Sequence, residues 1–294
     1  MLHLTNGDSA VPRLRAAGVE GEIIPWREVL HDGPVPGGLS RAELRALRGE
    51  FLGGEEPRLR SQEERLDRAL STHEPMTLWF EADLFDVLLL IQILERVPPG
   101  APVRLVLVGQ ESWTSVTDVE PAELARLGRD APPVGDSQLE LARAAWDAFT
   151  SDSPGPLEVL AAGTPVLPAI GQAAARLLEE LPWTGTGLTR TERQLLAPLA
   201  NGARTREEAF EAAIAAEERP FLGDLSAWAV LDRLTPLLAA RGVNERGRAV
   251  LAGEERWTPE TERWLGGMRV PPGPPPWEWD PDKARVQPPA VIDP

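Results

Sequence analysis

MTLWFEADLFDVLLLIQILERV, residues 76–97, is the most informative segment of this chain. Met76–Phe80 has the short apolar pattern of a buried strand, and Asp83–Val97 has the length and apolar density of a buried helix. Shortly afterwards, Val103–Val108 is another run that is apolar apart from Arg104, which predicts a strand that is covered on both faces. A strand, a helix and a second strand in this order form the repeating unit of a parallel α/β sheet.

The alternation of short strands and helices extends back to the N-terminus. Strands are predicted at residues 3–4 and 22–25, and helices at residues 39–48 and 57–70, with Ser40 and Ser61 as N-caps. Because helices separate the strands, we expect the strands to pair in parallel through right-handed crossovers. Residues 1–136 are therefore predicted to form a Rossmann-like α/β domain.

Three further regions follow this domain. Residues 137–184 read as a helical connector that Pro and Gly interrupt. Residues 185–253 have the spacing of a winged-helix-like module. The expected helix caps of this module are Thr189, Thr205, Asp224 and Asn244. Residues 254–294 form a Pro- and Trp-rich C-terminal tail, and its large indoles, Trp277 and Trp279, are expected to dock on the body of the protein.

The composition excludes several kinds of site. The 294 residues include no cysteine, which removes disulfides, thiolate nucleophiles, iron–sulfur clusters and cysteine zinc sites. The chain has 3 histidines, and we predict no metal site. It contains no P-loop motif GxxxxGK[ST] and no GxGxxG after the first strand, so nucleotide cofactors have no support and the cofactor is left unknown.

The charge argues against nucleic acid as a partner. The formal net charge is −16, from 46 acidic and 30 basic residues, and between residues 186 and 253 nine arginines are balanced by nine acidic residues. Binding to phosphate backbones needs a local concentration of positive charge, which the module lacks. The chain has no apolar run of about twenty residues and no signal-like N-terminus, so we expect a cytoplasmic protein without a membrane partner.

Six stretches of the chain carry a resemblance to a known family. They are LHLTNGDSA at 2–10, PWREVLHDGPVP at 25–36, LWFEADLFDVLLLIQIL at 78–94, LEELPWTGTGLTRTERQLL at 178–196, EERPFLGDLSAW at 217–228 and RWLGG at 263–267. Together they resemble the bacterial proteins that carry DUF1835, a domain of unknown function. The resemblance spans nearly the whole chain. It implies the architecture described above and brings no activity with it.

The first candidate site is Asn6, Gly7, Asp8 and Ser9, between the first strand and the following helix. Ligands of open α/β sheets bind at this edge, where Gly7 allows close approach of the backbone and a helix N-terminus attracts anions. The structural alternative is that Asp8 or Ser9 only caps the helix. Gly7-Asp8-Ser9 also resembles the start of the GDSL serine hydrolases, in which the serine is the nucleophile. His31 would then have to serve as its base.

The second candidate site follows the second strand and includes Trp26, His31 and Asp32. Trp26 offers an aromatic surface on which a ligand could stack. An imidazole with an ordinary pKa suits acid–base work near neutral pH, so His31 is a predicted catalytic residue. The alternative is an exposed loop histidine beside Asp32.

The third candidate site, Glu81, Asp83 and Asp86, follows the third strand, and Gly109 and Gln110 follow the fourth. Asp83 is a predicted catalytic residue that handles protons, although acidic residues at this position also cap helices. A variant of this hypothesis pools Asp83 with Asp8 and Asp32 into an acidic pocket for a cation or an amine.

The leading prediction is a protein that binds a small polar or anionic metabolite at the crevice of the α/β domain. Hydrolase or transferase chemistry on that ligand is left open. The alternative is a ligand-sensing regulator or adaptor, in which the winged-helix-like module contacts a protein partner or, with less support, DNA.

Overall fold

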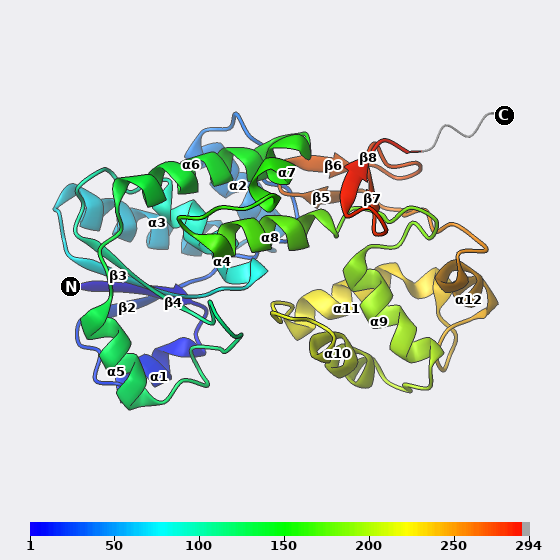
Figure 1. Ribbon diagram of the computed structural model, residues 1–294, viewed down its shortest axis with the longest axis horizontal. Coiled ribbons are helices and arrows are strands. Elements are labelled where there is room, and N and C mark those ends of the chain that lie inside the picture. The colour runs from blue at the N-terminus through cyan, green and yellow to red at the C-terminus, as the bar shows by residue number, and fades with distance from the viewer. Residues whose placement is uncertain (290–294) are drawn as a thin grey trace.

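The computed structural model describes residues 1–289 (Figure 1). Within them, four strands form one parallel sheet in the order β2–β1–β3–β4. The strands are β1 (Leu2–Asn6), β2 (Glu22–Trp26), β3 (Met76–Glu81) and β4 (Val103–Val108). The predicted α/β class and parallel pairing are confirmed, and the arrangement is consistent with a Rossmann-like domain.

Helices cover both faces of the sheet (Figure 1). α1 (Ala10–Ala16) and α5 (Pro121–Asp130) lie on one face, where Leu14 and Leu124 pack against Trp79 and Val106. The other face carries α2 (Arg41–Phe51), α3 (Glu56–Ser71) and α4 (Leu84–Leu94). Because both faces are covered, β3 is buried along its whole length, as its largely apolar sequence predicted.

The caps predicted in the first half of the chain had different outcomes. Ser40 caps α2 as expected, accepting a hydrogen bond from the backbone N–H of Glu43. The prediction for Ser61 was wrong, because α3 already begins at Glu56 and Ser61 lies inside it. Pro57 in the first turn explains the earlier start. The first N–H groups of a helix have no acceptor within the helix, so proline, which has no N–H, is favoured there.

The connector consists of α6 (Asp136–Thr150), α7 (Gly155–Ala161) and α8 (Pro168–Leu178). α6 and α8 pack against α4, which makes α4 a buried central helix. No helix among residues 1–289 is long and apolar enough to cross a membrane.

The C-terminal module has its own hydrophobic core. It contains α9 (Arg190–Ala200), α10 (Arg206–Ala215), α11 (Asp224–Arg233), a short 3-10 helix (Thr235–Leu237) and α12 (Glu245–Ala252). Thr189, Thr205 and Asn244 cap their helices through side-chain hydrogen bonds, whereas Gly223 occupies the capping position that was predicted for Asp224. The part of the chain from 185 to 253 shows only a single bridge between Leu238 and Val243 and no wing hairpin, so the winged helix stays a prediction.

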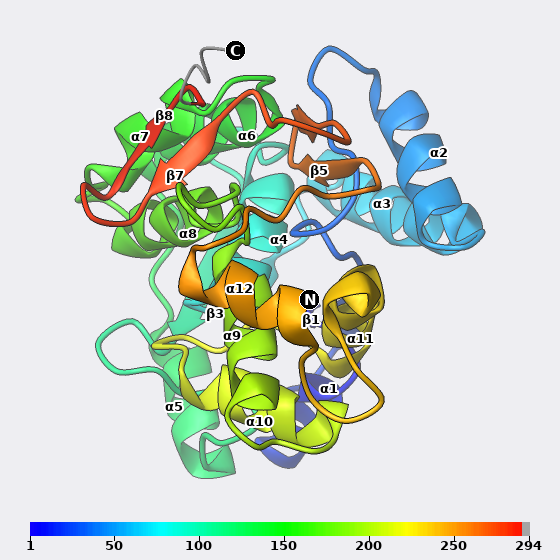
Figure 2. The same cartoon turned by 90° about the vertical axis from the view of Figure 1, so that its right-hand side faces the viewer.

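The tail is more ordered than its proline content suggested. It forms two antiparallel hairpins, β5 (Arg263–Leu265) with β6 (Met268–Val270), and β7 (Glu278–Asp280) with β8 (Arg285–Gln287). Figure 2 shows β7 and β8 beside α7 and α8. Trp279 docks there with 7% of its surface exposed, while its backbone N–H donates to Pro182. Residues 290–294 of the predicted tail lie outside the described residues.

Candidate functional site

The strand order creates a crevice at the carboxyl edge of the sheet. β2 lies on one side of β1, and β3 and β4 lie on the other, so the chain reverses direction across the sheet between β1 and β3. Ligands of open α/β sheets bind at such a reversal. The loops that follow the four parallel strands, at 6–9, 26–32, 81–83 and 109–110, therefore share one edge.

Three carboxyl groups are buried at the end of β3. Asp83 caps α4, accepting a hydrogen bond from the backbone N–H of Asp86 at 2.9 Å. The Asp86 carboxyl accepts from the backbone N–H of Glu81 at 2.6 Å and from the Asn6 side chain. Glu81 accepts from the backbone N–H of Val116 at 2.8 Å. Backbone amides and one asparagine thus hold this carboxyl cluster of Glu81, Asp83 and Asp86 in place.

The burial of this cluster changes its proton chemistry. Burial raises the pKa of Asp83 to about 7, helped by the nearby charge of Glu81. The pKa values of Asp86 and Glu81 are also raised, chiefly because water is excluded from them. A carboxyl that titrates near neutral pH is suited to general acid–base work, which is the role predicted for Asp83.

Arg219 connects the C-terminal module to this edge. Its guanidinium donates to the backbone carbonyls of Ala82 at 3.2 Å, Gln110 at 2.9 Å and Gly109. Gly109 and Gln110 therefore meet the module through their carbonyl groups. Beside Arg219, a cleft of about 330 Å³ is also lined by Asp83.

Neither Asp8 nor Ser9 forms a side-chain hydrogen bond with the carboxyl cluster within residues 1–289. Asp8 is exposed and forms an ion pair with Arg27, in which Nε of Arg27 donates to Oδ2 at 2.8 Å. This hydrogen bonding lowers the pKa of Asp8. Ser9 is exposed and makes no capping hydrogen bond with α1, so the structural alternative of a side-chain cap is not what the structure shows. Ser9 is also absent from the lining of the cavity around His31. His31 is therefore not placed to act as the base that the serine-hydrolase interpretation requires.

Two sequence predictions need correction. Trp26 is 1% exposed and its indole N–H donates to Gln92 at 2.8 Å, so it belongs to the core and offers no open stacking surface. Asp8, Asp32 and Asp83 are not gathered into one acidic pocket, because Asp8 is turned toward Arg27 and Asp83 toward its own helix. Within residues 1–289 no three His, Asp or Glu side chains are close enough together to hold a metal ion.

A buried ion pair shapes the loop that carries His31. Arg48 of α2 is 1% exposed and donates to the carboxylate of Glu28 at 2.8 Å. The same guanidinium donates to the backbone carbonyls of Val29 and Asp32, each at 2.8 Å. Arg48 therefore fixes the backbone on both sides of His31.

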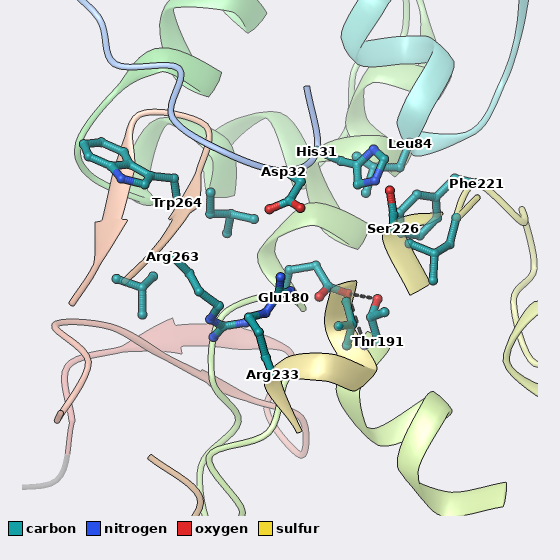
Figure 3. A pocket seen from close by; sticks show the side chains of 14 residues that line it. His31, Asp32, Leu84, Glu180, Thr191, Phe221, Ser226, Arg233, Arg263 and Trp264 are labelled. Carbon is teal, nitrogen blue, oxygen red and sulfur yellow. Dashed lines mark hydrogen bonds between the residues drawn. The ribbon is translucent and has the colours of Figure 1, made fainter. Parts of the chain in front are cut away.

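His31 lines a small cavity between the sheet edge and the C-terminal module, hereafter the His31 pocket (Figure 3). Five parts of the chain converge there: the loop after β2, the start of α4, the end of the connector after α8, the module and the β5–β6 hairpin. The polar lining residues are His31, Asp32, Glu180, Thr191, Ser226, Arg233 and Arg263. In Figure 3 the two arginines approach one another across the pocket from His31, and the Asp32 carboxylate points into the space between.

The His31 pocket contains buried polar atoms whose hydrogen bonding is incomplete. Among residues 1–289, neither ring nitrogen of His31 has a partner, and neither do Nε of Arg233 or Nε and Nη2 of Arg263. Arg263 uses only Nη1, which donates to Glu192 at 3.2 Å. Such groups are rare in folded proteins, because an unpaired buried donor costs about 1–3 kcal/mol.

The other carboxylate of the His31 pocket is already engaged. Glu180 accepts from Arg176 at 2.6 Å and from the hydroxyl of Thr191 at 2.5 Å. Burial is the largest influence and opposes its ionisation, but the charge of Arg176 and the hydrogen bonds from Arg176, Thr191 and Thr189 together outweigh it and hold the pKa of Glu180 below its usual value. Asp32 accepts only a hydrogen bond from the N–H of Gly33 within the described part of the chain. Asp32 is therefore the carboxylate with capacity for a ligand.

His31 itself is neutral at pH 7. Its ring lies against Phe85 and Phe221, with ring centroids 5.5 and 5.4 Å apart, and this burial lowers the pKa of His31 to about 4 against a smaller opposing effect of Asp32. One ring nitrogen then carries a proton and the other is an acceptor.

Sequence reasoning found His31 and Asp32 but missed Arg233 and Arg263. Both arginines lie in ordinary helical or extended segments, more than 200 residues from His31 along the chain. No local motif marks them. Only their shared burial beside His31 identifies them.

We expect His31 to make stability pH-dependent below pH 6.5. The unfolded chain takes up a proton at His31 near pH 6.5, whereas the folded protein resists it until about pH 4. The free energy of unfolding therefore falls by up to about 3 kcal/mol as the pH is lowered between these values. Urea unfolding at several pH values measures this loss.

Matched variants isolate the contribution of His31. His31→Asn should lack the loss, whereas His73→Asn, which changes an exposed histidine, should keep it. An identical pH dependence in both variants would show that His31 titrates normally in the folded protein.

Comparison of the sequence with protein-family models and with curated proteins finds no match. The function is therefore argued from the residues of the site.

Proposed function

We propose that the protein binds a small anionic metabolite in the His31 pocket. The observation that carries this proposal is that Arg233 and Arg263 line one cavity and that each keeps buried N–H groups without a partner in the described part of the chain. Two guanidinium groups on one wall repel each other, and an anion between them would relieve the repulsion and satisfy their free donors. Guanidinium is the side-chain group best matched to carboxylate and phosphate.

The proposed site lies at the sheet edge where the sequence predicted a ligand, but different residues hold the ligand. The loop after β2 supplies His31 and Asp32, whereas the anion-binding groups come from the module and the β5–β6 hairpin. Stretches that carry the resemblance to DUF1835 contribute His31, Ser226 and Arg263 to the pocket. Membership of that family is part of this proposal.

A second candidate function is a ligand-sensing adaptor. This function is favoured by the position of the His31 pocket between the α/β domain and the C-terminal module. Arg219 of the module also contacts the α/β domain, through hydrogen bonds to the carbonyls of Ala82 and Gln110. A ligand that contacts both sides would stabilise one arrangement of the module, and a protein partner could recognise that arrangement. The balanced charge of the module gives a DNA-binding version less support.

Calorimetric titration tests the binding function directly. Inorganic phosphate, sulfate and succinate serve as probes, each up to about 10 mM, with thermal unfolding as the second measurement. At least one probe should bind with a stoichiometry of one and raise the melting temperature.

Arg233→Gln is the informative variant, because Arg233 forms no hydrogen bond within residues 1–289 that the substitution would remove. Losing a charged hydrogen bond should weaken binding by about tenfold to a hundredfold. Arg241→Gln, an exposed arginine of the same module, is the matched control and should bind like the wild type. Failure of all three probes, or equal binding by both variants, contradicts the proposal.

A further inference from the structure

The donors of the His31 pocket approach its centre from opposite sides. Arg233 and Arg263 lie on one side and His31 on the other (Figure 3). The two oxygens of a carboxylate lie in one plane at one end of a ligand, so they satisfy donors from one direction. A tetrahedral oxyanion presents oxygens in several directions and can reach both walls. The arrangement of donors thus favours a tetrahedral anion over a carboxylate.

The pocket also presents acceptors to its ligand. The Asp32 carboxylate points into the cavity, and a neutral imidazole at His31 has one nitrogen with a free lone pair. An oxyanion without a proton would face the negative charge of Asp32 with nothing to donate. An oxyanion that keeps one proton can donate it to Asp32 or to His31, while its other oxygens accept from the arginines.

The size of the cavity limits the ligand further. The His31 pocket has a volume of about 50 Å³, which corresponds to only a few water-sized groups at about 10–15 Å³ each. That space matches one small oxyanion and is too small for a sugar or a nucleoside. A neighbouring cleft of about 350 Å³, which also contains Arg233 and Arg263 in its walls, has room for a larger group that is attached to the anion.

We infer that the His31 pocket selects a protonated tetrahedral oxyanion, hydrogen phosphate, and discriminates against sulfate. This inference rests on the proposed function and specifies its ligand. The hydrogen phosphate is either free phosphate or the monoanionic end of a phosphate monoester, which have the same protonated chemistry. Sulfate has the same shape but carries no proton at neutral pH, so it would meet the Asp32 carboxylate without a hydrogen bond.

Competition between phosphate and sulfate tests the inference. At pH 7.5 inorganic phosphate should bind the wild type at least about tenfold more tightly than sulfate, the effect of one well-placed hydrogen bond to a charged group. Asp32→Asn keeps the side-chain shape and the acceptor for the Gly33 N–H, but it removes the charge and adds a donor. In this variant the preference should fall to about one or reverse in favour of sulfate.

The control variant is Asp8→Asn, because Asp8 is an exposed aspartate at the same sheet edge that does not line the pocket. It should keep the wild-type preference. A merely structural role of Asp32 would weaken both anions equally and leave their ratio unchanged, which would overturn the inference.

The remaining outcomes separate the inference from the proposed function. Equal binding of phosphate and sulfate, or binding of succinate alone, overturns the inference while anion binding stands. Binding of none of the probes removes both. Glycerol 3-phosphate distinguishes the two sources, because the phosphate group of a monoester carries a proton only below about pH 6. Binding of this ester that appears as the pH falls from 7.5 to 5.5 supports the monoester, and binding of inorganic phosphate alone supports the free ion.

Discussion

Asp83→Asn is expected to stabilise the protein at pH 8 by up to about 4 kcal/mol and to leave its stability at pH 4 nearly unchanged. The folded protein holds the proton of Asp83 up to about pH 7, whereas the unfolded chain releases it near pH 4. Stability contributed by the protonated carboxyl is therefore present below pH 4 and lost as the pH rises to 7. Asparagine is uncharged and keeps an oxygen that accepts the backbone N–H of Asp86.

Urea unfolding of wild type and variant at pH 4, 6 and 8 measures this difference. Asp8→Asn is the comparison, because an exposed ion pair contributes only about 0.2–1 kcal/mol and should show no such trend. A gain of the same size at all three pH values would mean that the charge of Asp83 is not the cause. A carboxylate that is retained despite destabilising the fold is typical of a functional position.

Arg48→Met is expected to destabilise the protein by about 3–5 kcal/mol and to abolish anion binding in the His31 pocket. The change leaves the Glu28 carboxylate buried without its partner and removes the donor that holds the carbonyls of Val29 and Asp32. The backbone around His31 would then be free to move. Chemical denaturation and phosphate titration together report the two effects.

Two further variants show whether the buried charge causes the loss. Arg48→Met combined with Glu28→Gln should recover part of the stability, since a buried neutral amide costs less than a buried carboxylate. Arg60→Met removes an exposed ion pair with Glu56, which water screens, and should leave the stability nearly unchanged. If the double variant is as unstable as the single one, the unpaired charge of Glu28 is not the source of the instability.

Local patterns in the sequence were sufficient to predict the strands of the parallel sheet and most of the helix caps. The apolar runs at 76–80 and 103–108 became β3 and β4, and Asp83, Thr189 and Asn244 cap the helices that follow them. Strand burial and helix capping depend on residues within a few positions of each other, so the sequence alone could predict them. The same local reasoning placed His31 and Asp83 at strand ends, where sheet topology then brought them to one edge.

The tertiary structure decided which of these residues share a cavity. It buried Trp26 against Gln92, turned Asp8 toward Arg27 and brought Arg263 to His31 from the opposite end of the chain. None of these pairings has a periodic or local signature, because each depends on how separate elements pack after they form. By itself, the sequence determined the four strands of the parallel sheet, most of the helix caps and the acidic end of β3. The pairing of arginines with a neutral histidine in one cavity arises only when residues more than 200 positions apart are brought together by packing.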